Sequence, residues 1–290
     1  MRLRYSLHKI STKENNPFNA AEYSWFKFGD ILYAEKFAAE LFSGFIEEHA
    51  DLILSQTDIV ILPSPYLSIP TASNFLCSFF KIKLNEFLFQ NNRKACSESK
   101  IYRNQTYTED YGGMNFEQRI KLISNDTYYV DKNFIDGKYC IFLDDIKITG
   151  SHEVIINRIL DQHSRKNNCM FIYYAELSNT SIHPNIENYY NYFAIKSNKE
   201  IIEIMNRTTF RFNTRIIKYT LNAEEKDFIN IVENFNQFKL SELFQLAISN
   251  NYHQIEEYKN NIEVLNQKLC QSIYKKGNVK PSMPQNSLLV

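Results

Sequence analysis

Two adjacent carboxylates followed by small hydroxyl residues distinguish the stretch IFLDDIKITGSH, residues 141–152. Asp144 and Asp145 come directly after an apolar run that should be buried. Neighbouring carboxylates repel each other and cost stability unless a cation or a hydroxyl group satisfies them. The pair therefore indicates a functional use, such as the binding of a ligand that offers two hydroxyl groups.

The residues behind the acids have the composition of a phosphate-binding turn. Thr149 and Ser151 offer hydroxyl groups, and Gly150 lets backbone amides approach a ligand closely. If a helix begins here, its N-terminus favours an anion. One ligand with a diol at one end and a phosphate at the other, such as ribose 5-phosphate, would satisfy both halves of the stretch.

The elements that must position these residues predict an open α/β sheet. Apolar runs without alternation at residues 58–62, 139–143 and 169–175 are typical of strands covered on both faces. Apolar residues at helical spacing predict a helix over 150–160. A strand, helix and strand of this length fit a right-handed parallel crossover. The acids would then lie at the carboxyl end of a central strand, where open sheets bind ligands.

The rest of the chain supplies further helices and short strands. Helices are predicted at 30–46, capped by Asp30, at 70–80, with Pro70 in the first position, and at 115–123, and strands at 100–105 and 127–130. Paired glycines at 112 and 113 predict a loop or turn between 105 and 115.

Beyond about residue 215 the pattern is helical. A capping box of Asn222 and Glu225 predicts one helix, Ser241 begins a second, and Ile255 to Leu265 line a third. The fold class expected is α/β, an open and mostly parallel sheet with helices on both faces and a C-terminal helical appendage. The expected domains are an α/β domain at 1–215, a helical region at 216–272 and a disordered tail at 273–290.

CIFLDDIKITGSH resembles the signature of the type I phosphoribosyltransferases, in which an apolar strand ends in two acids, an apolar position, two variable ones and Thr-Gly. The resemblance implies binding of phosphoribosyl pyrophosphate (PRPP). Asp144 and Asp145 would contact the ribose 2- and 3-hydroxyls, with Mg²⁺ near them indirectly, through PRPP and water. The 5-phosphate would be wrapped by Ile148, Thr149, Gly150, Ser151 and His152.

Two other segments are similar to loops of this family. The residues Ser64, Pro65 and Tyr66 in PSPYLS would form the pyrophosphate loop, although the usual glycines or basic residue are missing. YRNQTYTEDYGGMNFEQR resembles the flexible catalytic loop of ComF-like members and of an uncharacterised bacterial group. The resemblance covers about residues 24–180. It implies catalytic roles for Arg103, Arg119 and Tyr107, with Arg103 or Arg119 closing over the leaving group.

The departures from the family pattern limit what the resemblance implies. Several members have a second Thr, or an Asp that acts as a base, where this chain has Ile148. Proton transfer to a purine with the help of a carboxylate is therefore not implied. Ser151 and His152 stand where small residues are usual. The N-terminal segment and residues 181–193 would form a hood over a nucleobase-like acceptor, whose identity stays open.

Ordinary structural interpretations stand beside these roles. Arg103 and Arg119 are also typical of surface arginines, and Lys147 is as consistent with a solvated side chain as with a phosphate ligand. His152 is equally consistent with a helix cap. In a chain with 19 Tyr, Tyr107 is also consistent with packing.

Three other classes of protein compete with an enzyme: a regulatory protein, a nucleic-acid-binding protein and a phospho-acceptor receiver domain. A regulatory protein that senses PRPP or a nucleotide and signals through the C-terminal helices is favoured by the missing glycines and Ile148. Equal numbers of basic and acidic residues, 33 each, disfavour nucleic acid and anionic membranes as partners. A phospho-acceptor receiver domain carries its acid pair at the end of its first strand, whereas two strands are predicted to precede Asp144 here.

Cysteine usage and the N-terminal residues predict the compartment. Five widely spaced cysteines without a CxxC pair indicate reduced thiols. The first residues lack the apolar core of a signal peptide, and no stretch approaches the roughly 18 apolar residues of a membrane span. We expect a cytoplasmic protein of nucleotide metabolism, and a homodimer is compatible with this interpretation.

Overall fold

The computed structural model describes residues 2–12, 15–103, 114–124, 128–161 and 167–276. The chain divides into two compact units, residues 1–220 and 221–290. The boundary falls at the end of helix α9 (Thr214–Leu221), a few residues after the boundary that the sequence predicted. Each unit is described by itself.

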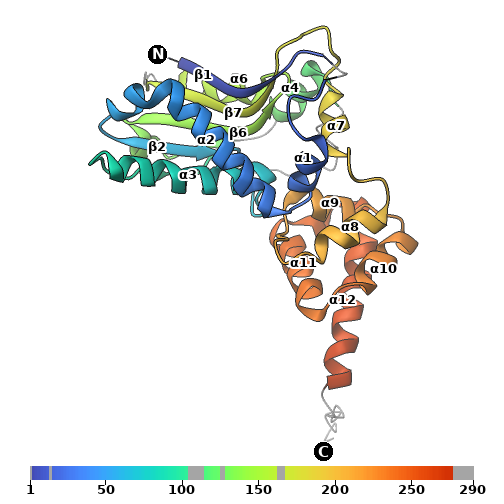
Figure 1. The fold of residues 1–290 in the computed structure, drawn as a ribbon. Coiled ribbons are helices and arrows are strands. Elements are labelled where there is room, and N and C mark those ends of the chain that lie inside the picture. The colour runs from blue at the N-terminus through green and yellow to red at the C-terminus, as the bar shows by residue number, and fades with distance from the viewer. Residues whose placement is uncertain (1, 13–14, 104–113, 125–127, 162–166, 277–290) are drawn as a thin grey trace, which may run out of the picture. The chain divides into compact units, whose positions relative to one another are not determined.

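A five-stranded sheet is the centre of the first unit, and every neighbouring pair in it is parallel (Figure 1). The strand order is β1-β7-β6-β2-β3. The strands are β1 (Arg2–Ile10), β2 (Ile59–Pro63), β3 (Ser97–Glu98), β6 (Tyr139–Lys147) and β7 (Cys169–Leu177). The open parallel sheet predicted from the apolar runs is confirmed.

Strand β6 is longer than its apolar run. The sequence predicted its end at Leu143, but pairing with β7 continues as far as Lys147, opposite Glu176. Asp144 and Asp145 therefore lie inside a paired strand rather than in the turn behind it. A charged pair can occupy this position because each acid has its own partner, as described below.

Strand β1 was not predicted. Residues 2–10 were assigned to the hood, but they form the edge strand beside β7, with Tyr5 opposite Ile172. In the sequence RLRYSLHKI, Leu3, Tyr5 and Leu7 alternate with polar residues. Such alternation is typical of a strand with one covered and one polar face.

Helices cover both faces of the sheet. On one face α2 (Ile31–Leu54) and α3 (Ala72–Gln90) pack on Tyr139, Ile141 and Leu143 of β6. On the other face α6 (Ser151–Asp161) packs on Cys140 and Phe142. Successive side chains of β6 thus enter two separate cores, as the alternation of a strand requires.

The helix starts test the predicted caps. The Asp30 side chain accepts a hydrogen bond from the Leu32 amide at 3.2 Å, which confirms it as the cap of α2. The start predicted for α3 was wrong: its cap is Thr71, which forms a capping box with Asn74. The Thr71 and Asn74 side chains satisfy the first amides of the helix, and Pro70 therefore lies one residue before the cap and not in the first turn.

The short strands β4 (Tyr102–Arg103) and β5 (Tyr128–Tyr129) form a separate antiparallel ribbon. Both were predicted at about these positions but not as a sheet of their own. Helices α4 (Phe116–Ser124) and α5 (Lys132–Ile135) flank β5 along the chain. Four further helices of the first unit are α1 (Ala20–Lys27), α7 (Ile186–Asn191), α8 (Asn198–Met205) and α9.

Gly29 lies where the chain turns from α1 into α2, and its φ is +98°. A Cβ atom there would lie 2.3 Å from the Arg211 carbonyl oxygen. We expect Gly29→Ala to lower the free energy of unfolding by about 3 kcal/mol or more, because the clash adds to the backbone strain. Urea denaturation measures this.

Gly137 is the matched control for that prediction. Its φ is +71°, but a Cβ atom would have no neighbour within 4 Å. Gly137→Ala should therefore show only the backbone cost of about 1–2 kcal/mol. Equal losses in the two variants would contradict the role given to the close approach at Gly29.

The second unit is helical, with α10 (Glu225–Glu233), α11 (Gln237–Ser249), the 3-10 turn η2 (Tyr252–Gln254) and α12 (Glu256–Lys276). The three predicted helices are present, but the cap predicted at Asn222 and the helix start predicted at Ser241 were wrong: the N-cap of α10 is Glu224, and α11 begins at Gln237 after its cap Asn236. Residues 273–276, predicted as tail, continue α12, and residues 277–290 lie outside the described part.

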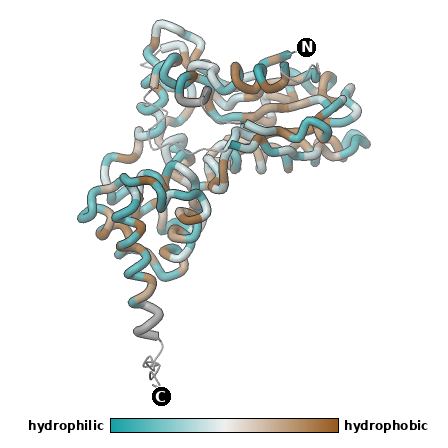
Figure 2. The backbone as a smooth tube through the Cα atoms, turned by 180° about the vertical axis from the view of Figure 1, so that it is seen from behind, coloured by the Kyte–Doolittle hydropathy of each residue, from teal (hydrophilic) through white to brown (hydrophobic). Residues whose placement is uncertain are grey.

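Hydrophilic and hydrophobic stretches alternate along the helices of this unit in Figure 2, as expected for helices with one buried face. Phe228, Leu243 and Leu265 are fully buried and come from the three α-helices. Among the described residues, no helix combines the length and hydropathy needed to cross a bilayer.

Candidate functional site

Asp144 is the more accessible of the two acids, with a side chain that is 16% exposed. Its Oδ2 lies 3.0 Å from Nδ1 of His152, and its Oδ1 accepts a hydrogen bond from the Asp145 amide at 2.9 Å. Burial raises the pKa of Asp144, but the hydrogen bond and charge of His152 outweigh burial and leave it lowered. The Ser64 hydroxyl also lowers this pKa, although it makes no hydrogen bond of good geometry. Asp144 is therefore an ionised carboxylate.

Asp145 is held inside the protein and is only 4% exposed. Its Oδ2 accepts hydrogen bonds from the Tyr23 hydroxyl and from Nζ of Lys27, both at 2.5 Å. Burial raises the pKa of Asp145, and the charge of Lys27 offsets only part of this rise. The two adjacent acids thus have different partners, from α6 and from α1.

The predicted turn follows directly on β6. Gly150 has a φ of +74°, and Ser151 is the first residue of α6. The Thr149 and Ser151 hydroxyls lie 3.0 Å apart. The Ile148 side chain is buried in the core, so only its backbone is available to a ligand. Strand, glycine turn and helix start are therefore arranged as the phosphate-binding hypothesis expected.

Lys147 lies against this turn instead of in solvent. Its Cε is 3.3 Å from the position of a Cβ atom on Gly150, and its Nζ pairs with Glu176 at 2.8 Å. Glu176 also binds Nζ of Lys9 at 2.7 Å and the Ser6 hydroxyl at 3.0 Å. The cluster joins the carboxyl ends of β1, β6 and β7.

The Glu176 cluster predicts an acid-sensitive contribution to stability. Burial raises the pKa of Glu176, but the hydrogen bonds from Lys147 and Lys9 lower it to about 2. A lowered folded-state pKa stabilises the protein above the ordinary value, and this stability is lost as the pH falls from about 4.5 to about 2. The contribution at neutral pH is at most roughly 3 kcal/mol.

We therefore expect Glu176→Gln to lose stability at pH 7 and to approach the parent protein near pH 2.5. Urea denaturation at both pH values measures the difference. Glu35→Gln on the exposed face of α2 is the control and should change neither value. A loss for Glu176→Gln that is the same at both pH values would contradict the assignment.

The loop after β2 is fastened by residues from outside it. The Asn74 amide donates to the Ser64 carbonyl oxygen at 3.1 Å. Nζ of Lys100 donates to the Leu67 carbonyl oxygen at 2.8 Å and lies 3.7 Å from the centre of the Tyr66 ring. Lys100 thus brings a basic side chain to the loop after β2. Sequence reasoning missed it, and its only signal was its place at the start of the strand predicted at 100–105.

Residues 207–214, which follow α8 and include the first residue of α9, join this loop to α1. The Asn213 amide donates to the Lys27 carbonyl oxygen at 3.1 Å, and the Thr214 hydroxyl donates to the Ile69 carbonyl oxygen at 2.9 Å. Arg207 pairs with the buried Asp30 at 2.8 Å. We call residues 207–214 the strap. No pattern in the sequence predicted it.

The predicted catalytic residues have different environments. Arg103 is half-buried in β4. Arg119 is 3% exposed, and its guanidinium pairs with Glu187 of α7 at 2.8 Å and donates to the Met114 carbonyl oxygen at 2.8 Å. To reach a ligand it would have to leave Glu187. Tyr107 and the rest of the loop 105–113 lie outside the described residues, so the catalytic role of Tyr107 stays a prediction.

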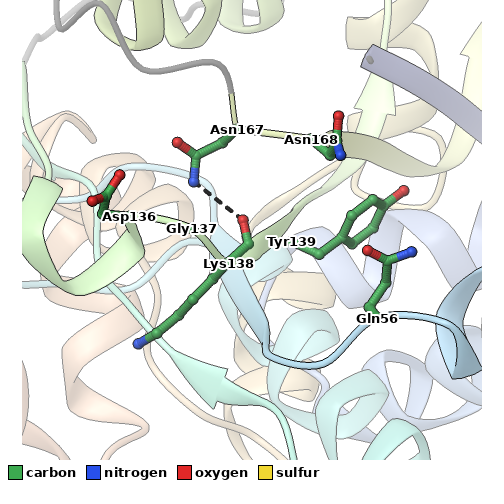
Figure 3. A pocket seen from close by; sticks show the side chains of 7 residues that line it. All are labelled: Gln56, Asp136, Gly137, Lys138, Tyr139, Asn167 and Asn168. Carbon is green, nitrogen blue, oxygen red and sulfur yellow. Dashed lines mark hydrogen bonds between the residues drawn. The ribbon is translucent and has the colours of Figure 1, made fainter.

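A cavity of about 260 Å³ lies at the opposite, amino edge of the sheet. Its lining comes from the segments before β2, β6 and β7 (Figure 3). The Asn167 amide donates to the Lys138 carbonyl oxygen at 3.1 Å and to the Ile135 carbonyl oxygen at 2.7 Å. Asn167 therefore ties two segments together, and the cavity is separate from the acid pair.

Over the described ranges, no three His, Cys, Asp or Glu side chains are grouped to hold a metal ion. The acid pair gives at most two carboxylates, of which Asp145 already binds Lys27. Asp144 fits a contact to a hydrated Mg²⁺ that a phosphorylated ligand brings with it, because Mg²⁺ keeps several waters and takes few protein ligands.

A parallel sheet with an acid pair and a glycine turn at the carboxyl end of a central strand defines a phosphoribosyltransferase-like protein. A family model described as "PRTase ComF-like", where PRTase stands for phosphoribosyltransferase, matches residues 1–265, and the chain belongs to this family. The resemblance of CIFLDDIKITGSH to phosphoribosyltransferases is thus confirmed.

Other comparisons add little. A crystal structure of a hypoxanthine phosphoribosyltransferase from Staphylococcus aureus is 13% identical and covers 49% of this chain and 74% of its own, with a TM-score of 0.29. No curated protein matches the chain.

Proposed function

We propose that the protein binds PRPP with Mg²⁺ at the carboxyl end of β6 and transfers the 5-phosphoribosyl group to a nitrogen nucleophile, releasing pyrophosphate. One observation carries the proposal. The ionised Asp144 and the turn at Thr149–Ser151 belong to one strand–turn–helix unit, in which His152 of α6 contacts Asp144 directly. This unit would hold a contact to the diol and a contact to the phosphate at a fixed separation.

The proposed roles follow from these positions. Asp144 accepts hydrogen bonds from the ribose diol, with Asp145 beside it, and the backbone amides of the turn with the Thr149 hydroxyl hold the 5-phosphate. Ser64 to Tyr66 would face the pyrophosphate, and the buried Ser64 hydroxyl makes no hydrogen bond of good geometry among the described residues. Mg²⁺, when bound, would neutralise charge on the pyrophosphate.

In the proposed reaction, the bond between C1 of the ribose and the pyrophosphate oxygen breaks as the acceptor nitrogen bonds to C1. Pyrophosphate leaves with the bonding electrons, and the nitrogen loses its proton. The transition state resembles an oxocarbenium ion, so the protein would act by holding the sugar and stabilising the leaving group. Lys100, whose Nζ donates to the Leu67 carbonyl oxygen in the loop after β2, is a cation suited to stabilising the leaving group.

The acceptor is proposed to be nucleobase-like. Tyr189 of α7 is 42% exposed, and its ring packs edge-to-face with Phe193 at 5.4 Å. An exposed aromatic ring on the predicted hood supports a flat acceptor.

Pyrophosphate release tests the enzymatic proposal. The protein is incubated with PRPP, Mg²⁺ and a panel of nucleobases and amines, and the parent protein should release pyrophosphate with at least one acceptor. Thr149→Val should reduce the release, and Asp51→Asn on the exposed face of α2 should leave it unchanged. PRPP binding without release under any condition would refute an enzyme, and absence of binding would refute both functions.

A PRPP-sensing regulator is the second candidate, and the strap favours it. Residues 207–214 contact both α1 and the loop after β2, and the same segment continues into α9, which ends where the second unit begins. A ligand that ordered these contacts would change the protection of α9. Hydrogen exchange in α9 that slows with PRPP, without pyrophosphate release, would support sensing, whereas unchanged exchange would contradict it.

A further inference from the structure

We infer that Lys27 and Tyr23 of α1 are positioning residues, which hold Asp145 in the orientation that it needs to contact the ribose of PRPP. This inference rests on the proposed function and adds to it two residues from outside the acid motif. The two acids then differ in their supports: Asp144 is contacted by His152 of α6, and Asp145 is held by Tyr23 and Lys27 of α1.

The contacts fix the carboxylate at one oxygen. Lys27 and Tyr23 both donate to Oδ2 of Asp145 at 2.5 Å. Both donors bind Oδ2, and we assign the other oxygen, Oδ1, to a sugar hydroxyl. Two donors on one oxygen leave the carboxylate little rotational freedom, and a group that is already ordered binds a ligand at a smaller entropic cost.

The donors themselves are held firmly. Tyr23 and Lys27 are four residues apart and so lie on one face of α1. The Asn19 side chain caps the start of the helix by accepting hydrogen bonds from the Ala21 and Glu22 amides, and Asn213 binds the carbonyl oxygen of Lys27 at its end. The Tyr23 ring is fully buried, packs at a tilt against Phe26 and is stacked on Phe37.

A purely structural role explains this arrangement less well. The strand residues on either side of the acids, Leu143 and Ile146, are buried and apolar. Apolar side chains that fill the same volume often stabilise a protein as well as a buried ion pair does. The ion pair of Lys27 and Asp145 instead lies next to Asp144 in β6, shortly before the turn at Thr149–Ser151. Its location is therefore the one expected for a group that orients a ligand-binding carboxylate.

The test measures the dissociation constant of PRPP with Mg²⁺ by calorimetry. Tyr23→Phe removes one donor and keeps the ring, and we expect it to weaken binding roughly 5- to 20-fold. Lys27→Met should weaken binding roughly 10- to 100-fold. Lys27→Arg, which keeps the charge, should recover most of that loss. Lys36→Met is the control, because Lys36 pairs with Glu22 of α1 at the surface and not with Asp145.

Non-additivity separates a positioning role from a general loss of structure. In an Asp145→Asn background, Tyr23→Phe and Lys27→Met should cause no further loss of affinity, because both act through Asp145. Full additivity, or unchanged affinity in both single variants, would overturn the inference while the parent protein still bound PRPP. If Lys27→Met does not fold, the isosteric Tyr23→Phe and its cycle with Asp145→Asn decide the matter. Failure of the parent protein to bind PRPP would overturn the proposed function itself.

Discussion

Replacement of both acids, Asp144→Asn with Asp145→Asn, is expected to abolish measurable binding of PRPP. Each substitution removes a charged acceptor of a hydrogen bond from the ribose diol. A charge-assisted hydrogen bond contributes about 1.5–3 kcal/mol, so two of them correspond to roughly 100- to 10,000-fold in affinity. Isothermal titration calorimetry with PRPP and Mg²⁺ measures the loss, and an affinity equal to that of the parent protein would refute the site.

The single variants make this prediction sharper. Asp144→Asn leaves the Lys27 contact of Asp145 in place, so its effect reports on the ligand. Asp145→Asn also leaves the buried Lys27 without its carboxylate, so part of its effect is a loss of stability. Asp51→Asn, at an exposed position on α2, controls for the substitution itself and should bind PRPP as the parent protein does.

Arg119→Ala is expected to destabilise the first unit by about 3–5 kcal/mol, because it leaves Glu187 buried without a cation. The two side chains are 3% and 9% exposed and 2.8 Å apart. Removing both charges with Arg119→Met and Glu187→Leu should restore much of the stability, since apolar residues of similar volume tolerate burial. Urea denaturation followed by circular dichroism measures both effects.

The exposed ion pair of Lys94 and Asp58 provides the comparison. Its side chains are 76% and 40% exposed, and Lys94→Ala should cost less than about 1 kcal/mol. A similarly small loss in Arg119→Ala would show that the Glu187 contact is not formed in solution. Arg119 would then be available to close over pyrophosphate, as the resemblance to the family implied.

The sequence predicted the central strands well because buried parallel strands leave a strong signal. The runs that became β2, β6 and β7 are apolar without alternation, and the turn behind β6 contains the glycine that its positive φ requires. Strand β1 has a charged or polar residue at every second position, so its pattern was weaker than that of the buried strands. Helix starts depended on which of several neighbouring polar residues served as the cap.

The partners of the site residues were beyond sequence reasoning for a different reason. Lys27 lies 118 residues before Asp145, and Tyr23 lies 122 residues before it. Nothing in the types or spacing of these residues indicates that α1 would pack over β6. The same holds for Lys100 beside the loop after β2 and for Glu187 beside Arg119. Local patterns identified the acid motif, whereas the tertiary fold alone determined which cations reach it.

The strap has a practical consequence for anyone who wants to study the α/β domain in isolation. Its residues hold the backbone of α1 at Lys27 and the loop after β2 at Ile69, and α9 follows at once. A shortened chain that stopped after α8 would keep every strand of the sheet but would lose the hydrogen bonds that the strap makes to α1 and to the loop after β2. Deletions made to find a minimal ligand-binding fragment should therefore spare the chain through residue 221.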